Sequence, residues 1–290
     1  MGTSSSSKGS PGNVPMVPPW VPPLPPPPPP PPDVDPEVNP EQTVPETTAP
    51  TKTPAPVLPT GPVPVAPQRR FASARSAANR FAESGSARDM KQSVGRYVRS
   101  GYGGASTATR RLGGTISNAG ALYSVLTPGE PEAGAEPTAR VDRTLLAGRT
   151  AREIMDAVVE AVRPVDGTQD SEASRKAIKG SLSDVLERYP EANLLELTEE
   201  QRSFAIERYM ALDVYQRYCL DIGKTIQDSA PNPTAVLSRL KDVREYIRET
   251  VTAAFRKLRT AGQKLSAYRI SQIVGAALLQ ACQTFERDGV

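Results

Sequence analysis

The residue best suited to chemistry stands at position 2, where the chain opens with MGTSSSSKGS. Gly2 is small enough for the initiator methionine to be removed, which would leave its α-amine as the N-terminus. Such an amine has a pKa near ~7.7–8.0, against ~10.4 for a lysine side chain, so a useful fraction of it is uncharged at neutral pH. Because glycine has no Cβ, this amine can also enter a narrow active site. The sequence therefore predicts that Gly2 is a nucleophilic acceptor for the chemistry of a partner.

A second chemistry fits the same residue. The first six residues match the M-G-x-x-x-[ST] pattern of N-myristoylation through Ser6. A single acyl chain anchors a protein only marginally. We therefore expect no membrane association, and acylation of Gly2 remains an alternative to the reaction above.

The rest of the chain lacks the residue types that most enzymes use. It contains no histidine, which excludes Ser-His-Asp, Cys-His and histidine–metal arrangements. Cys219 and Cys282 lie 63 residues apart, a spacing typical of neither a metal site nor a redox pair, and are expected to be buried thiols in a reducing compartment. The phosphate-binding pattern GxxxxGK[ST] is absent. The sequence predicts a cytoplasmic protein that is not an enzyme and binds no metal or cofactor.

Two N-terminal segments should position Gly2: an exposed tail over residues 1–10 and a proline-rich segment over residues 11–67. Of the 31 prolines in the chain, 24 fall in the second segment, including an unbroken run of eight. Proline disrupts helix interiors and central strands, and its runs favour an extended rod that advances ~3.1 Å per residue. We therefore predict a disordered tether. Trp20, the only tryptophan, either anchors this tether to a partner or belongs to a passive spacer.

Residues 68–128 form a basic segment rich in Ala, Arg and Gly, with ten Lys or Arg against two Asp or Glu. Short helices are expected, broken at SGS and SGYGG. Because Tyr97 and Tyr102 lie among arginines, one hypothesis is binding of single-stranded nucleic acid by charge and stacking. The other is a helical hairpin that packs on an acidic face of the same chain. The candidate contacts for nucleic acid or an acidic partner are Arg69, Arg70, Arg75, Arg80, Arg96, Arg99, Arg110 and Arg111.

Residues 129–144 are predicted to be a linker, and residues 145–290 an all-α domain. No stretch alternates with period two, so no sheet is expected and the fold class is mainly α. Two capping boxes, which satisfy the first amides of a helix, are predicted for Thr150 with Glu153 and for Thr198 with Gln201.

Two further helices are predicted. In the first of them the apolar residues are spaced by threes and fours, which places one stripe against a core. Asn232 followed by Pro233 opens the first of them. Its stripe comprises Val236, Leu240, Val243, Ile247, Val251, Ala254 and Leu258. The last helix carries Leu265, Ile270, Ile273, Val274, Ala277, Leu278 and Phe285.

This layout resembles the QatB family of bacterial Qat anti-phage defence operons. The resemblance is carried by the MGTS start, the PPW tether, the block RRFASARSAANRFA, the stretch SVGRYVRSGYGGA and the RRLGG that follows it. In the helical domain it extends only to the helical character and to stretches such as REYIRE.

The resemblance implies partners and a modification. Such operons also encode an ATPase, a TatD-like nuclease and a QueC-like enzyme (QatC), whose family activates 7-carboxy-7-deazaguanine with ATP. In related defence systems a QueC-like enzyme joins a deazaguanine to the N-terminal glycine of a protein. The resemblance therefore implies that Gly2 accepts a 7-deazaguanine derivative covalently and that Thr3, Ser4 and Ser5, with Trp20, help the partner enzyme to recognise it.

Overall fold

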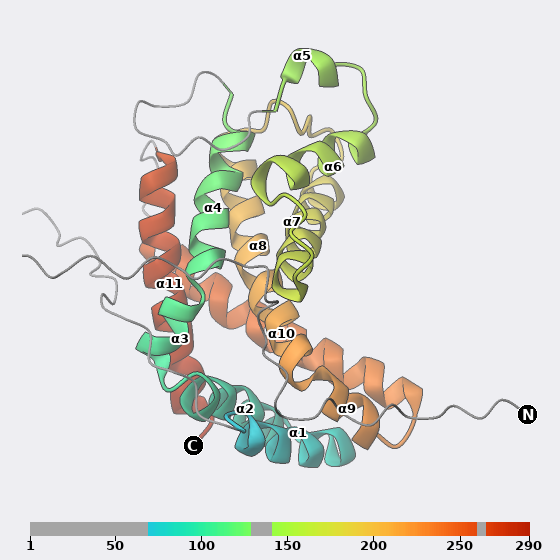
Figure 1. Cartoon of the computed structure of the whole chain (residues 1–290), viewed down its shortest axis with the longest axis vertical. Coiled ribbons are helices and arrows are strands. Elements are labelled where there is room, and N and C mark those ends of the chain that lie inside the picture. The colour runs from blue at the N-terminus through green and yellow to red at the C-terminus, as the bar shows by residue number, and fades with distance from the viewer. Residues whose placement is uncertain (1–68, 129–140, 260–264) are drawn as a thin grey trace, which may run out of the picture. The chain divides into compact units, whose positions relative to one another are not determined.

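The computed structural model describes residues 69–128, 141–259 and 265–290 (Figure 1). Within these ranges the structure is helical and contains no strand, which confirms the predicted mainly α fold. The predicted tail and tether, and most of the predicted linker, lie outside the described residues. The helices are α1 (Ala72–Ser84), α2 (Ala87–Arg96), the π-helix η1 (Tyr97–Gly101), α3 (Ala105–Arg111), α4 (Gly113–Leu126), α5 (Arg143–Leu146), α6 (Ala151–Val162), α7 (Gln169–Arg188), α8 (Glu199–Tyr218), the π-helix η2 (Cys219–Gly223), α9 (Lys224–Ser229), α10 (Pro233–Leu258) and α11 (Ala267–Asp288).

Both predicted capping boxes are present. The amide of Glu153 donates to Thr150 Oγ1 at 3.3 Å, and the Glu153 carboxylate accepts from the Thr150 amide at 2.9 Å, at the start of α6. Thr198 and Gln201 repeat this reciprocal pair at the start of α8. Each box satisfies two amides that have no partner within the first turn of a helix. The starts of α6 and α8 are thus determined by local sequence.

The long helix α10 begins where predicted and buries most of its predicted apolar stripe, while Val236, Leu240 and Leu258 toward its ends are only partly buried. Asn232 Oδ1 accepts from the amide of Ala235 at 2.8 Å, and proline occupies the first helical position. The middle of the stripe is buried, with Val243, Ile247 and Val251 fully covered. Of the apolar residues predicted for the last helix, those from Ile270 to Phe285 are buried in α11, whereas Leu265 precedes that helix and is only partly buried. None of the described helices has the length and apolar content needed to cross a bilayer.

The basic segment and the C-terminal helices share one hydrophobic core. The prediction separated residues 68–128 from residues 145–290, whereas their buried apolar side chains form a single cluster. Helix α11 lies along α4 and also contacts α2 and α3, while α7 packs against α8 (Figure 1). The hairpin of α1 and α2 therefore packs on the same chain, as one of the two hypotheses for the basic segment stated, but through the shared apolar core and not on an acidic face.

The chain leaves its helical path within SGYGG, as predicted. The helical path continues beyond α2 through η1 to Gly101, where an added Cβ would lie 2.4 Å from the ring of Phe71. The turn into α3 falls on Gly103 and Gly104, which have φ values of +82° and +98°. Residues with a Cβ rarely adopt such positive φ values, so glycine is needed at both positions.

Candidate functional site

The predicted acceptor Gly2 and its predicted recognition residues Thr3, Ser4, Ser5 and Trp20 lie outside the described residues. The structure does describe the eight candidate arginines and the surfaces with which they interact. They divide into three groups by what their guanidinium groups contact.

The first group is used within the fold. Arg75 donates from Nε and Nη2 to the main-chain oxygen of Asp221, at 3.3 and 3.1 Å. Arg80 forms an ion pair with Asp89 at 3.2 Å and donates to Gln92 Oε1 at 3.0 Å. These contacts join α1 to η2 and α1 to α2, so both arginines hold helices of the basic segment in place.

The second group comprises Arg70 and Arg111, which lie beside Tyr102, and Arg110, which contacts its own helix α3. The guanidinium groups of Arg70 and Arg111 lie 5.6 and 6.0 Å from the centre of its ring, within the range of a cation–π interaction. Arg110 Nη2 donates to Thr107 Oγ1 at 3.3 Å. Tyr102 is only half-buried, so this cluster of cations around one ring reaches the surface.

The third group comprises Arg69, Arg96 and Arg99. Within the described ranges these side chains form no ion pair, and Arg69 and Arg99 are exposed. The structure therefore does not gather the eight arginines into one surface. Any contact of the basic segment with an anionic partner depends first on the third group and on the cations beside Tyr102.

Tyr97 and Tyr102 of the basic segment belong to an aromatic cluster. Tyr97 lies 5.2 Å from Phe71, 5.0 Å from Tyr102 and 5.2 Å from Tyr218, measured between ring centres. Its side chain is buried, and its hydroxyl donates to Asp221 Oδ2 at 3.0 Å. The stacking hypothesis for single-stranded nucleic acid therefore fails for Tyr97, because its side chain is buried among other rings. Of the pair, only Tyr102 reaches the surface.

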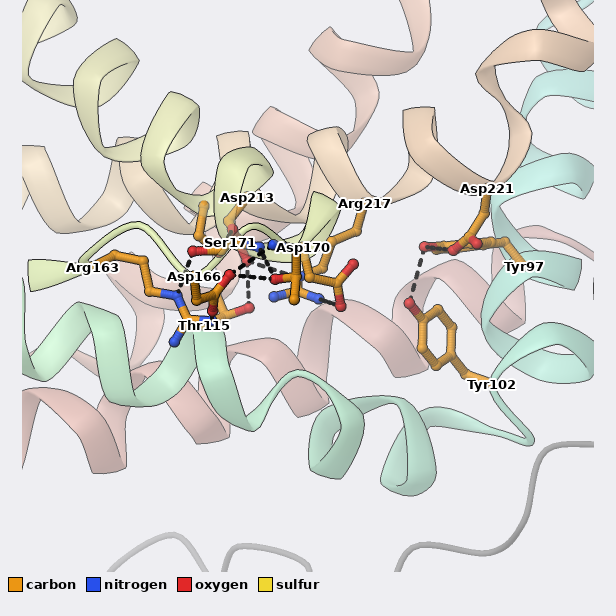
Figure 2. A network of polar contacts seen from close by, with 12 residues as sticks. Tyr97, Tyr102, Thr115, Arg163, Asp166, Asp170, Ser171, Asp213, Arg217 and Asp221 are labelled. Carbon is orange, nitrogen blue, oxygen red and sulfur yellow. Dashed lines mark hydrogen bonds and ion pairs between the residues drawn. The ribbon is translucent and has the colours of Figure 1, made fainter. Parts of the chain in front are cut away.

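The Tyr97–Asp221 hydrogen bond links the two π-helical turns, η1 and η2 (Figure 2). A π-turn inserts one residue into a helix and redirects the side chains around it. Burial, followed by the proximity of Tyr102 and Asp221, raises the pKa of Tyr97 well above its ordinary value. Burial also raises the pKa of the Asp221 carboxyl group, against the opposing effect of its hydrogen bond with Tyr97. The tyrosine is thus neutral and serves as a hydrogen-bond donor.

A second polar network is centred on Asp213 of α8, which is fully buried (Figure 2). Its carboxylate accepts from Thr115 Oγ1 of α4 at 2.5 Å and from Ser174 Oγ of α7 at 2.7 Å, and it pairs with Arg217 Nε at 3.0 Å. Arg217 Nη1 also pairs with Asp170 at 3.1 Å. A buried carboxylate is costly unless it is paired and hydrogen-bonded. These contacts meet that requirement and fasten α4 and α7 to α8.

The electrostatics of Arg217 reflect this position. Burial acts to lower the pKa of its guanidinium group, but the ion pairs with Asp213 and Asp170 outweigh burial and raise it. Nearby, Arg163 Nε donates to Ser171 Oγ at 3.1 Å and Nη2 pairs with Asp166 at 2.7 Å, which holds the turn between α6 and α7. The sequence had predicted no role for Asp213. Its signal is an acid and an arginine four residues apart within the apolar run MALDVYQRY.

The arrangement offers little reactive chemistry. Among the described residues no group of three or more potential metal ligands lies together. Both cysteines are free, and burial raises the pKa of Cys219 and raises that of Cys282 to about 12, so both are thiols at neutral pH. The cavity beside Tyr102 and Arg217 measures about 20 Å³, space for roughly one water. The two networks are suited to holding helices together.

The geometry thus defines an all-α domain built around one core and a buried polar network. Residues 103–285, well over half of the chain, match the family model of the Qat anti-phage system associated protein QatB. The chain belongs to the QatB family, and its role lies in Qat anti-phage defence. No match was found among curated proteins or among solved structures. Helices α3 to α10 and nearly all of α11 fall inside the matched region, while α1, α2 and η1 precede it.

Proposed function

We propose that the chain is a non-enzymatic component of the Qat system that presents Gly2 to the QueC-like enzyme QatC for a 7-deazaguanine-type modification. In this proposal the helical domain docks other Qat proteins in the cytoplasm, with the ATPase and the TatD-like nuclease as further candidates. The observation that carries the proposal is the family match of residues 103–285 to a Qat protein. The structural use of the buried groups at Asp213 and Tyr97 supports it, because these groups are already engaged within the fold.

The proposed reaction is an acylation of the N-terminal amine. The partner enzyme uses ATP to activate the carboxyl group of 7-carboxy-7-deazaguanine, and the uncharged amine of Gly2 attacks the activated carbon. A C–N bond forms while the bond to the activating group breaks, and that group leaves with the bonding electrons. The amine loses one proton, and the product is an amide. No oxidant or reductant is consumed.

The test is co-expression of the chain with the QueC-like enzyme, followed by intact-mass analysis and sequencing of the N-terminal peptide. We expect a deazaguanine adduct on Gly2 and protection of cells against phage. Gly2→Val should abolish both, because a β-branched side chain crowds the amine at the active site. Gly9→Val is the matched control, since it makes the same substitution in the same tail but leaves the acceptor unchanged.

Three results would contradict the proposal. One is an adduct that persists in Gly2→Val, and another is a native N-terminal peptide that retains Met1. The third is a myristoyl group on Gly2 in place of the deazaguanine, which would favour the alternative of a membrane-tethered protein. Loss of phage protection in Gly9→Val as well would assign the effect to the tail as a whole.

A further inference from the structure

A groove of about 760 Å³ runs between α10, the start of α2 and the last turns of α11. Its longest wall is one face of α10, from Asp242 to Lys257, lined at intervals of three and four residues. Fifteen steps along a helix span about 23 Å, or four turns. The groove therefore has the length of an ordinary helix in a globular protein.

The charges on α10 are distributed unequally around the helix. All three of its acidic residues, Asp242, Glu245 and Glu249, line the groove. Five of its six basic residues do not, and Lys257 is the exception. A helix whose charges served only solubility would carry both signs interspersed. Helix α10 as a whole has more basic than acidic residues, so this wall of the groove is acidic because of where the acidic residues lie.

Part of this negative charge has no compensation. Glu245 pairs with Arg248, whereas Asp242 and Glu249 are exposed and form no ion pair within the described part of the chain. On the α2 side, Lys91 is paired with Asp288 at 3.8 Å, so its charge does not neutralise the acidic wall. The carboxylates of Asp242 and Glu249 are therefore available to form ion pairs with cationic side chains of a partner.

The floor of the groove allows another backbone to approach closely. It contains Ala87, Ala253 and Ala254, whose side chains are short, next to the buried Met90 and the ring of Tyr246. The distance between two packed helices is set by the side chains at the contact, so alanines permit a short one. An acidic wall also disfavours nucleic acid, whose phosphates it would repel.

We infer that this groove is the docking site for a basic helix of a partner protein. The inference rests on the proposed docking role of the helical domain and specifies the surface and the charge of its partner. Lysine or arginine side chains of that helix pair with Asp242 and Glu249, and its small or apolar residues lie over the alanines. Such pairing steers association and is weakened by salt.

The experiment uses the full chain, tagged and co-expressed with the other components of the Qat system. The groove variant is Asp242→Lys with Glu249→Lys, and the control is Glu187→Lys with Glu191→Lys. All four residues are exposed and form no ion pair within the described ranges, so the two variants make the same change of charge. Equal helicity and equal urea midpoints verify that both fold. We expect the groove variant to reduce the co-purified component at least about tenfold and the control to leave it unchanged.

The possible results distinguish an error in the location of the docking site from an error in the proposed docking role. If the wild type and both variants co-purify the component equally, the groove is not the docking site, although the docking role stands. If the wild type co-purifies nothing, the docking role fails and the inference fails with it.

A photo-crosslinking amino acid in place of Ala253 identifies the occupant. A crosslink to a lysine- or arginine-rich helix of a Qat component is the expected result. A crosslink to an acidic segment, to a second copy of this chain or to the chain itself would overturn the inference.

Discussion

Replacing Arg217 by methionine tests whether the network around Asp213 holds the helices together. The substitution keeps a side chain of similar length but removes the charge that faces Asp213. Asp213 has no exposed surface, and the Arg217 side chain is only 12% exposed, so water cannot replace the lost partner. Removing one member of a buried ion pair costs about 3–5 kcal/mol, because the other charge is left uncompensated.

The two hydroxyl donors, Thr115 and Ser174, remain in place and offset part of this loss. We therefore expect Arg217→Met to lower the free energy of unfolding by about 3 kcal/mol, near the lower end of that range. For a domain of this size the melting temperature should fall by about 6–12 °C. The assay is urea and thermal denaturation of the full chain, followed by far-ultraviolet circular dichroism.

Asp170 provides the matched control because it contacts the same guanidinium from a side chain that is 68% exposed. Asp170→Asn should cost less than about 1 kcal/mol, as exposed ion pairs contribute little. The double variant Asp213→Asn with Arg217→Met should cost at least about 1 kcal/mol less than the sum of the single variants. Equal losses for Arg217→Met and Asp170→Asn, or strict additivity in the double variant, would refute a buried and coupled pair.

Three other predictions follow from particular residues. Gly95→Ala should lower the free energy of unfolding by about 1–3 kcal/mol, because the added Cβ would lie 2.6 Å from the α11 backbone. Gly113→Ala is the control and should be neutral or stabilising, because nothing lies within 4 Å of its added Cβ. Equal urea midpoints for the two variants would contradict this prediction. Asp221→Asn should stabilise the fold at neutral pH, because burial raises the pKa of that carboxyl group and so disfavours its charged form. This gain should shrink as the pH falls through the raised pKa, and a gain that is constant with pH in urea titrations would count against the reasoning. Nucleic-acid binding, the alternative function, predicts that Arg96→Ala with Arg99→Ala lowers the slope of log K against log salt by about 1.4–1.8, and gel shifts with no salt dependence would dismiss it.

Local signals in the sequence predicted several helices. A capping box such as Thr150 with Glu153 involves residues three apart, and a stripe such as Val243, Ile247 and Val251 repeats within one helix. These features are determined by interactions between residues that are close together in the sequence. For this reason the starts of α6, α8 and α10 and the buried faces of α10 and α11 agree with the structure.

Contacts between residues far apart in the sequence could not be predicted from such local patterns. The Tyr97–Asp221 bond joins residues 124 positions apart, and the Thr115–Asp213 bond joins residues 98 apart. Neither the period of apolar residues nor the charge of a segment predicts which turn faces which. The sequence therefore allowed the hypothesis that Tyr97 and Tyr102 stack on nucleic acid, whereas tertiary packing buries Tyr97.

Helix α1 is the first described helix after the predicted tether in the sequence, and it is firmly anchored. Phe71 is buried in the core, Arg75 bonds to η2, and Gly95 brings α2 against the α11 backbone. If the proline-rich segment is extended as predicted, deleting its run of eight prolines shortens the reach of Gly2 by about 25 Å. Because none of these prolines belongs to the described core, the urea midpoint should not change. Modification of Gly2 should fall while docking of the partner at the α10 groove is retained, because Gly2 precedes Phe71 in the sequence and the residues of the groove follow it.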